Sequence, residues 1–136
     1  MRHRYVCFGR QPFPPRQIFV PINTGNMHWT LAVIDMQARR IDYMDSMSGS
    51  GMGCMENLQR YLEDEAANKG FDDSLTGFAL QTRTEVPQQE NGCDCGVFTC
   101  KFADFEAMER QCDFSQEHMQ YFRRRMVAEI LESNAE

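Results

Sequence analysis

Residues 28–36, HWTLAVIDM, form the stretch that decides the fold of this chain. The run is continuous, apolar and rich in β-branched side chains, which predicts a strand buried on both faces of a sheet. RIDYMD (40–45) follows a short polar loop and alternates Ile41 and Tyr43 with polar neighbours, as a half-buried strand does. The two runs are therefore expected to form an antiparallel hairpin.

Two further strands and three helices are expected around this hairpin. QIFVPI (17–22) and FALQTRTEV (78–86) have the apolar or alternating character of strands. The first helix is expected to end at Gly70, a typical C-cap residue. The second is expected from Cys95 to about Glu109, with Asp94 as its cap. The predicted order is β-β-β-α-β-α-α, which indicates a single α+β domain.

The last helix is expected to begin after Ser115 and to bury one apolar stripe. That stripe comprises Met119, Phe122, Met126, Val127, Ile130 and Leu131. Methionine and aromatic side chains at helical spacing are predicted here as core residues and not as a ligand site.

The distribution of charge argues against a nucleic-acid partner. The net charge is −6, and residues 1–16 contain four arginines and no acidic residue. The remaining 120 residues therefore carry 10 basic and 20 acidic side chains. Such an acidic body repels nucleic acid and suits a basic protein partner, although most of these charges are expected simply to be solvated. Residues 1–16 are expected to be a poorly ordered Arg/Pro-rich lead-in, and 17–136 the domain.

The start of the chain lacks a secretory signal, and no apolar run is long enough to span a membrane. An intracellular protein is therefore expected, whose six cysteines stay reduced. The sequence Cys93-Asp94-Cys95, followed by Cys100, leaves zinc binding open as an alternative. However, paired C-x₂-C spacings are absent and the next histidine is His118. A cysteine with a chemical role is the preferred interpretation.

Cys95 is the candidate nucleophile. It is predicted at the N-terminus of a helix, where the helix dipole favours a thiolate. Gly96 leaves the backbone beside the sulfur open to a substrate carbonyl. A purely structural cysteine is the alternative at such a position, and Cys100, within the apolar helix, is expected to be a small buried residue of that kind.

His28 is the candidate base, because His3 lies in the lead-in and His118 is expected on the surface. In the predicted hairpin Asp45 lies opposite Thr30 or Leu31, within about 10 Å of His28 along the sheet. An aspartate there can orient the imidazole. A histidine satisfied by a backbone carbonyl is the structural alternative.

Two other aspartates, Asp35 and Asp42, are expected to face solvent at the other end of the hairpin. Gln89, in the loop VPQQENG before Cys95, is a candidate donor for the oxyanion that forms during acyl transfer. Surface glutamines are common, so this local signal is weak by itself.

Four motifs together resemble the C-terminal part of the SUMO-specific (sentrin/ubiquitin-like-protein-specific) protease family. They are HWTLAVID, YMDSM, VPQQENGCDCGVFTCKFAD and FSQEHMQYFRRRMVAEIL, and the resemblance runs from about Ile18 to Leu131. It implies that His28, Asp45, Cys95 and Gln89 are the catalytic histidine, aspartate, nucleophile and oxyanion glutamine. It also implies that Trp29 encloses the Gly-Gly tail of the substrate, while a core aromatic is the alternative for this residue.

The resemblance implies a papain-like cysteine protease fold with an antiparallel or mixed sheet packed by helices. The implied reaction is hydrolysis after the C-terminal Gly-Gly of SUMO, in precursors or in isopeptide bonds to lysine. No metal or organic cofactor is implied, and the nucleus is the expected location. The chain begins later than the family's catalytic domain, so the fold is expected to be N-terminally truncated. An inactive remnant that binds a ubiquitin-like protein, or a protease for another modifier, are the alternatives.

Overall fold

A computed structural model describes residues 15–70 and 75–133 of the chain, so most of the expected lead-in lies outside the described residues. The predicted element order is confirmed, with a short 3₁₀ helix (η2) added before the last helix. The elements are β1 (Gln17–Thr24), β2 (His28–Asp35), β3 (Arg40–Met44), α1 (Met52–Lys69), β4 (Ala79–Thr82), α2 (Cys95–Ala107), η2 (Gln116–His118) and α3 (Met119–Ser133).

The four strands form one mixed sheet in the order β1-β2-β3-β4. The predicted hairpin of β2 and β3 is present, antiparallel, with Leu31 opposite Met44. β4 is parallel to β3 and ends at Thr82, which lies opposite Tyr43. The expected strand to residue 86 is therefore too long, because β3 ends one residue after Tyr43 and offers no further partner groups.

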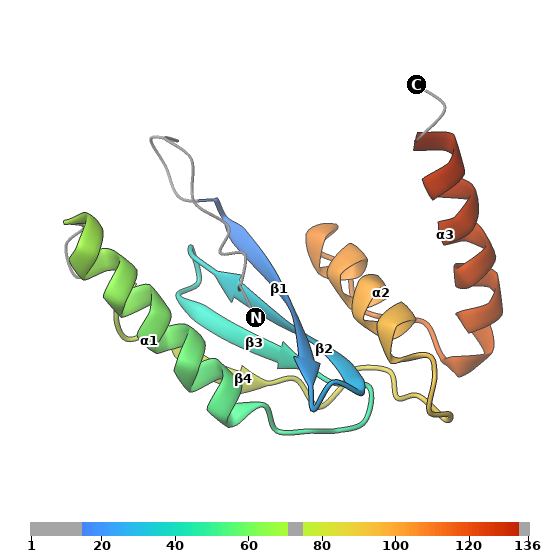
Figure 1. The fold of residues 1–136 in the computed structure, drawn as a ribbon, viewed down its shortest axis with the longest axis horizontal. Coiled ribbons are helices and arrows are strands. Elements are labelled where there is room, and N and C mark those ends of the chain that lie inside the picture. Colours follow the sequence, from blue (N-terminus) through green and yellow to red (C-terminus); the bar gives the residue numbers. More distant parts are fainter. Residues whose placement is uncertain (1–14, 71–74, 134–136) are drawn as a thin grey trace.

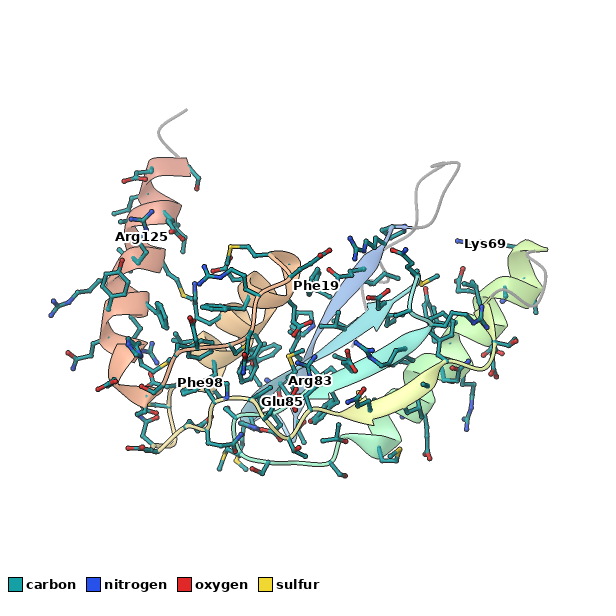
Figure 2. All side chains as sticks on the ribbon, turned by 180° about the vertical axis from the view of Figure 1, so that it is seen from behind. Phe19, Lys69, Arg83, Glu85, Phe98 and Arg125 are labelled. Carbon is teal, nitrogen blue, oxygen red and sulfur yellow. The ribbon has the colours of Figure 1, made fainter. Side chains whose placement is uncertain are left out.

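Helices cover both faces of the sheet (Figure 1). Alternate residues of β2 point to opposite faces, so Leu31 and Val33 pack in the cluster under α2 while Ala32 and Ile34 pack in the cluster under α1. The α2 cluster is rich in phenylalanine, and Phe98 (labelled in Figure 2) is 0% exposed within it. Burial on both faces explains why the sequence of β2 is continuously apolar.

β3 is buried from Ile41 to Met44, which corrects the expectation of a half-buried strand with Asp42 facing solvent. Asp42 is 2% exposed, and its Oδ1 and Oδ2 share the single N–H of Arg40 Nε, at 2.8 and 2.9 Å. Arg83 Nη1 lies 3.7 Å from the same carboxylate and 3.3 Å from Glu106 on α2. Because β3 lies between two strands and beneath helices on both faces, its polar side chains are buried and need charged partners.

Only the beginning of α3 packs against the rest of the described chain, which corrects the expected buried stripe. Met119 is buried, and Phe122 and Met126 are partly buried against the α2 cluster. Val127, Ile130 and Leu131 are 57–66% exposed. Figure 1 shows why: α3 stands beside α2 and points away from the sheet, so no described element covers its later turns.

Among the described residues, no helix combines the length and apolar character needed to cross a membrane.

Cys100, on α2, and Cys112, after it, differ in their surroundings. Cys100 is exposed, so the expectation of a buried cysteine there is wrong, because its side of α2 faces away from the sheet. Cys112 packs against the α2 cluster. Burial, with a smaller effect of the Glu106 charge, raises the pKa of the Cys112 thiol to about 11.

We expect Cys112 to resist iodoacetamide at pH 8 in the folded protein, because a thiol with a pKa of about 11 is almost entirely protonated there. Exposed Cys100 should react readily, and urea should make Cys112 react at a similar rate. Peptide mass spectrometry after timed alkylation measures both. Equal native alkylation rates at Cys100 and Cys112 would contradict this expectation.

The raised pKa of Cys112 also means that the folded state loses stability as pH rises through about 11.

Candidate active site

The structure brings His28 and Asp45 into direct contact. His28 is the first residue of β2, directly after the turn from β1, and Asp45 follows the last residue of β3. Leu31 lies opposite Met44 in the antiparallel pair, so the next residue, Asp45, comes opposite Thr30. Thr30 is two residues after His28 along β2. His28 Nε2 lies 2.6 Å from Asp45 Oδ1, and the two side chains are 19% and 7% exposed. The hairpin register thus places a charged orienting group against one imidazole nitrogen.

The loop after Asp45 holds this carboxylate in place. The backbone N–H of Met47 donates to Asp45 Oδ1 at 2.7 Å, and that of Gly49 donates to Oδ2 at 3.0 Å. A Cβ atom at Gly49 would lie only 2.3 Å from Oδ2. A side chain at position 49 would therefore force the Asp45 carboxylate away from its present position.

Substituting Gly49 with alanine should displace the Asp45 carboxylate and reduce catalytic turnover by about 10–100-fold, the cost of a misplacement near 1 Å. Gly53→Ala is the matched control, because a Cβ there meets no atom within 4 Å. Steady-state hydrolysis of a fluorogenic Gly-Gly substrate measures the effect, with circular dichroism to establish folding. Equal turnover in the two variants would show that Gly49 does not position Asp45.

Cys95 is the first residue of α2 and is 7% exposed. The start of this helix meets the start of β2, since a Cβ atom at Gly96 would contact Trp29 Cδ1 at 4.0 Å. Trp29 itself is 43% exposed, which contradicts its alternative interpretation as a core aromatic. Because Nε2 of His28 faces Asp45, Nδ1 is the ring nitrogen that remains to exchange a proton with a thiol.

Asp94 occupies the predicted cap position of α2, but its carboxylate makes no capping hydrogen bond. It accepts instead from Asn91 Nδ2 and Gln116 Nε2, both at 2.8 Å, and from Arg123. The pKa of Asp94 is held below its usual 3.8 by these hydrogen bonds. The bond from Asn91 has the largest effect, and those from Gln116 and Arg123 have smaller ones. The residue preceding the candidate nucleophile is therefore a buried anion bound to the C-terminal part of the chain.

Gln89 lies in a loop that is bonded to the segment after β3. Its backbone N–H donates to Ser46 O at 2.8 Å, and its Oε1 accepts from Ser46 Oγ at 2.5 Å. Its Nε2 donates to Asn91 O at 2.5 Å. Ser46, which is 1% exposed, is a positioning residue that sequence reasoning missed. The adjacent Asp-Ser pair was the available signal, because a buried serine beside a functional aspartate needs a polar partner.

The fold and this grouping of side chains are typical of papain-like cysteine proteases, in which a cysteine at a helix N-terminus works with a histidine and its polar partner. The sequence profile of the Ulp1 protease family, C-terminal catalytic domain, matches residues 11–135. The chain belongs to this family, which confirms the resemblance seen in the sequence.

Among the described residues, no cluster of three or more His, Cys, Asp or Glu side chains could hold a metal ion.

Several curated relatives and solved structures are similar to this chain. A sentrin-specific protease of Caenorhabditis elegans is 38% identical over 84% of the chain, and sentrin-specific protease 2 of Pongo abelii is 42% identical over 88%. The ubiquitin-like-specific protease ESD4 of Arabidopsis thaliana is 42% identical over 88%. The chain spans only 16%, 20% and 24% of the length of these three relatives.

Two solved structures share the fold. The C-terminal Ulp1 protease domain in complex with SMT3, the yeast ortholog of SUMO, is 31% identical, with a TM-score of 0.69, covering 80% of this chain and 49% of that one. SUMO protease Ulp1 with its catalytic cysteine oxidized to a sulfenic acid is 30% identical, with a TM-score of 0.75 and coverages of 89% and 55%. These matches confirm the papain-like fold with a mixed sheet packed by helices.

Proposed function

We propose that this chain carries the catalytic part of a cysteine protease that cleaves after the C-terminal Gly-Gly of SUMO, in precursors and in isopeptide bonds to target lysines. The contact of 2.6 Å between His28 and Asp45, beside the helix start that carries Cys95, is the observation that supports this most directly. Membership of the Ulp1 family supports the same reaction, and the solved complex of a Ulp1 domain with SMT3 supports SUMO as the partner.

Cys95 acts as the nucleophile, His28 as both base and acid, and Asp45 as the group that orients His28. His28 Nδ1 takes the proton of the Cys95 thiol, and the sulfur attacks the carbonyl carbon of the last glycine. The same nitrogen then gives its proton to the leaving amine, which breaks the C–N bond and leaves a thioester. Water hydrolyses the thioester with His28 again as base. Asp45 keeps the second ring proton on Nε2 and stabilises the imidazolium.

The developing oxyanion is stabilised by Gln89 together with the start of α2. The first N–H groups of a helix have no intrahelical partner, so the N–H of Cys95 is available to a substrate oxygen. Gln89 Nε2 carries two hydrogens, of which one is directed to Asn91 O. The second can serve the oxyanion. Trp29, exposed beside Gly96, is proposed to cover the glycines of the substrate, which have no side chains to obstruct their passage.

Replacing Gln89 with alanine should lower turnover by about 10²–10³-fold while slow covalent trapping of Cys95 by a reactive substrate analogue persists. The reason is that the nucleophile and base remain while one donor to the tetrahedral intermediate is lost. Turnover of a SUMO-linked fluorophore measures the first effect, and gel shift with the analogue measures the second. Unchanged turnover would remove Gln89 from the site.

The proposed function is tested with SUMO carrying a C-terminal thiol-reactive group, alongside the equivalent ubiquitin reagent. We expect a covalent adduct with SUMO only, located at Cys95 by peptide mass spectrometry. An adduct with ubiquitin alone would assign another modifier. Binding of SUMO by a folded sample without any adduct would contradict catalysis and favour a binding role. No binding at all would contradict SUMO as the partner.

We also propose that the protein acts in the nucleus, where the family it resembles largely functions. A fluorescent fusion imaged in cells tests this, and uniform exclusion from the nucleus would contradict it.

A further inference from the structure

A charged contact links α3 to the residue directly before Cys95. Asp94 is 6% exposed, and its Oδ1 accepts from Arg123 Nε at 2.8 Å and from Arg123 Nη2 at 2.5 Å. Arg123 Nη2 also donates to the backbone oxygen of Cys93 at 3.0 Å. One guanidinium from the C-terminal helix thus holds both the carboxylate and the backbone of the turn that leads into α2. Figure 1 shows the start of α3 beside this loop.

The contact with Arg123 compensates the negative charge of Asp94 beside Cys95. The N-terminus of a helix favours a thiolate, but a carboxylate one residue earlier opposes a second negative charge nearby. Hydrogen bonds, that from Asn91 first, lower the pKa of Asp94, so its carboxylate is ionised at neutral pH. Its negative charge therefore repels a thiolate at Cys95 throughout that pH range. Two of its partners, Asn91 and Gln116, are neutral and supply no compensating charge. Arg123 supplies it.

We propose that Arg123 is a positioning residue for the thiol chemistry, which cancels the charge of Asp94 and fixes the turn at Cys93, and thereby supports the reactivity of Cys95 as a nucleophile. The inference rests on the proposed function of Cys95 as nucleophile, and it extends that function to a helix outside the catalytic groups. It gives α3 a role in reactivity, although most of its apolar residues are exposed.

The charged and titratable groups around this helix start come from several elements. Arg123 approaches from α3 and binds Asp94 directly. The pair of His28 and Asp45 lies at the ends of β2 and β3, near the start of α2 through Trp29 and Gly96. Cys93 is exposed in the loop. A change at Arg123 leaves the other groups in place, so its effect on Cys95 can be measured separately.

The test follows the rate of Cys95 alkylation by iodoacetamide from pH 5 to 10, in a Cys93→Ala, Cys100→Ala background of the whole chain. We expect Arg123→Gln to raise the pH of half-maximal rate by about one unit, the effect expected of one uncompensated nearby charge. Arg123→Lys should preserve the wild-type midpoint. Arg125→Gln is the matched control, because Arg125 lies further along α3 (Figure 2). It pairs with Glu129 at 2.7 Å and not with Asp94.

The double variant Asp94→Asn, Arg123→Gln separates charge from structure. If Arg123 acts by cancelling the carboxylate, removing both charges should return the midpoint to within about 0.3 units of wild type. A midpoint that stays raised in the double variant, or that is unchanged in Arg123→Gln, would overturn the proposal. If Arg123→Gln alone does not fold, the double variant must recover both folding and the wild-type midpoint, and its failure to do so also overturns it. Alkylation needs no SUMO, so a failed SUMO reaction would not affect this result.

Discussion

Replacing Cys95 with alanine is expected to reduce hydrolysis of a SUMO Gly-Gly linkage by at least about 10⁴-fold, leaving only the residual catalysis that the oxyanion donors and substrate binding supply. The reason is that no other group at the start of α2 can form the thioester. Single-turnover cleavage of a SUMO precursor, followed on gels over hours, measures the loss. Binding of SUMO should be retained, since the side chain removed is small and 7% exposed.

Cys93 provides the control for that experiment, because it is two residues away and exposed. Cys93→Ala should keep cleavage within about twofold of wild type, since Arg123 contacts only the backbone oxygen of this residue. Loss of activity in Cys93→Ala with full activity in Cys95→Ala would reverse the assignment of the nucleophile.

Substitution of Asp45 by asparagine should lower turnover by about 10³–10⁴-fold with little change in substrate affinity. Asp45 Oδ1 accepts from both His28 and the Met47 N–H, and Oδ2 accepts from the Gly49 N–H. An amide has only one oxygen. It either presents NH₂ to the imidazole and favours the wrong tautomer, or presents NH₂ to a backbone N–H and loses that hydrogen bond.

Asp35→Asn is the matched control for this effect. Asp35 ends β2, the strand that His28 begins, and it also accepts hydrogen bonds from two backbone N–H groups, those of Gln37 and Ala38. Its substitution removes one carboxylate charge from the same hairpin but leaves His28 untouched. Steady-state kcat and KM are measured for Asp45→Asn and Asp35→Asn. Equal kcat values in the two variants would show that Asp45 does not orient the base.

Local sequence patterns predicted the framework that carries the site. The continuous apolar run of β2 and its pairing with 40–45 are present, with the register that sets Asp45 near His28. The C-cap at Gly70 is also present, with φ of 68°. These features are predictable because strand pairing across a short loop and helix termination depend on residues close together in sequence.

The same sequence did not reveal which way several side chains face. Asp94 was predicted correctly as the residue before α2, but its carboxylate binds Arg123, 29 positions later in the chain. Asp42 is buried and Cys100 is exposed, each opposite to expectation. In every case the outcome depends on which element lies against that face of the strand or helix.

The sequence by itself thus determined the order of elements, the central hairpin and the identities of the candidate catalytic residues. Only the tertiary structure decided that β3 is buried on both faces, that α3 leaves Ile130 and Leu131 exposed, and that Arg123 neutralises the carboxylate beside Cys95. The physical reason is that backbone pairing and capping are short-range, whereas burial and charge compensation are properties of surfaces that meet only when distant segments pack.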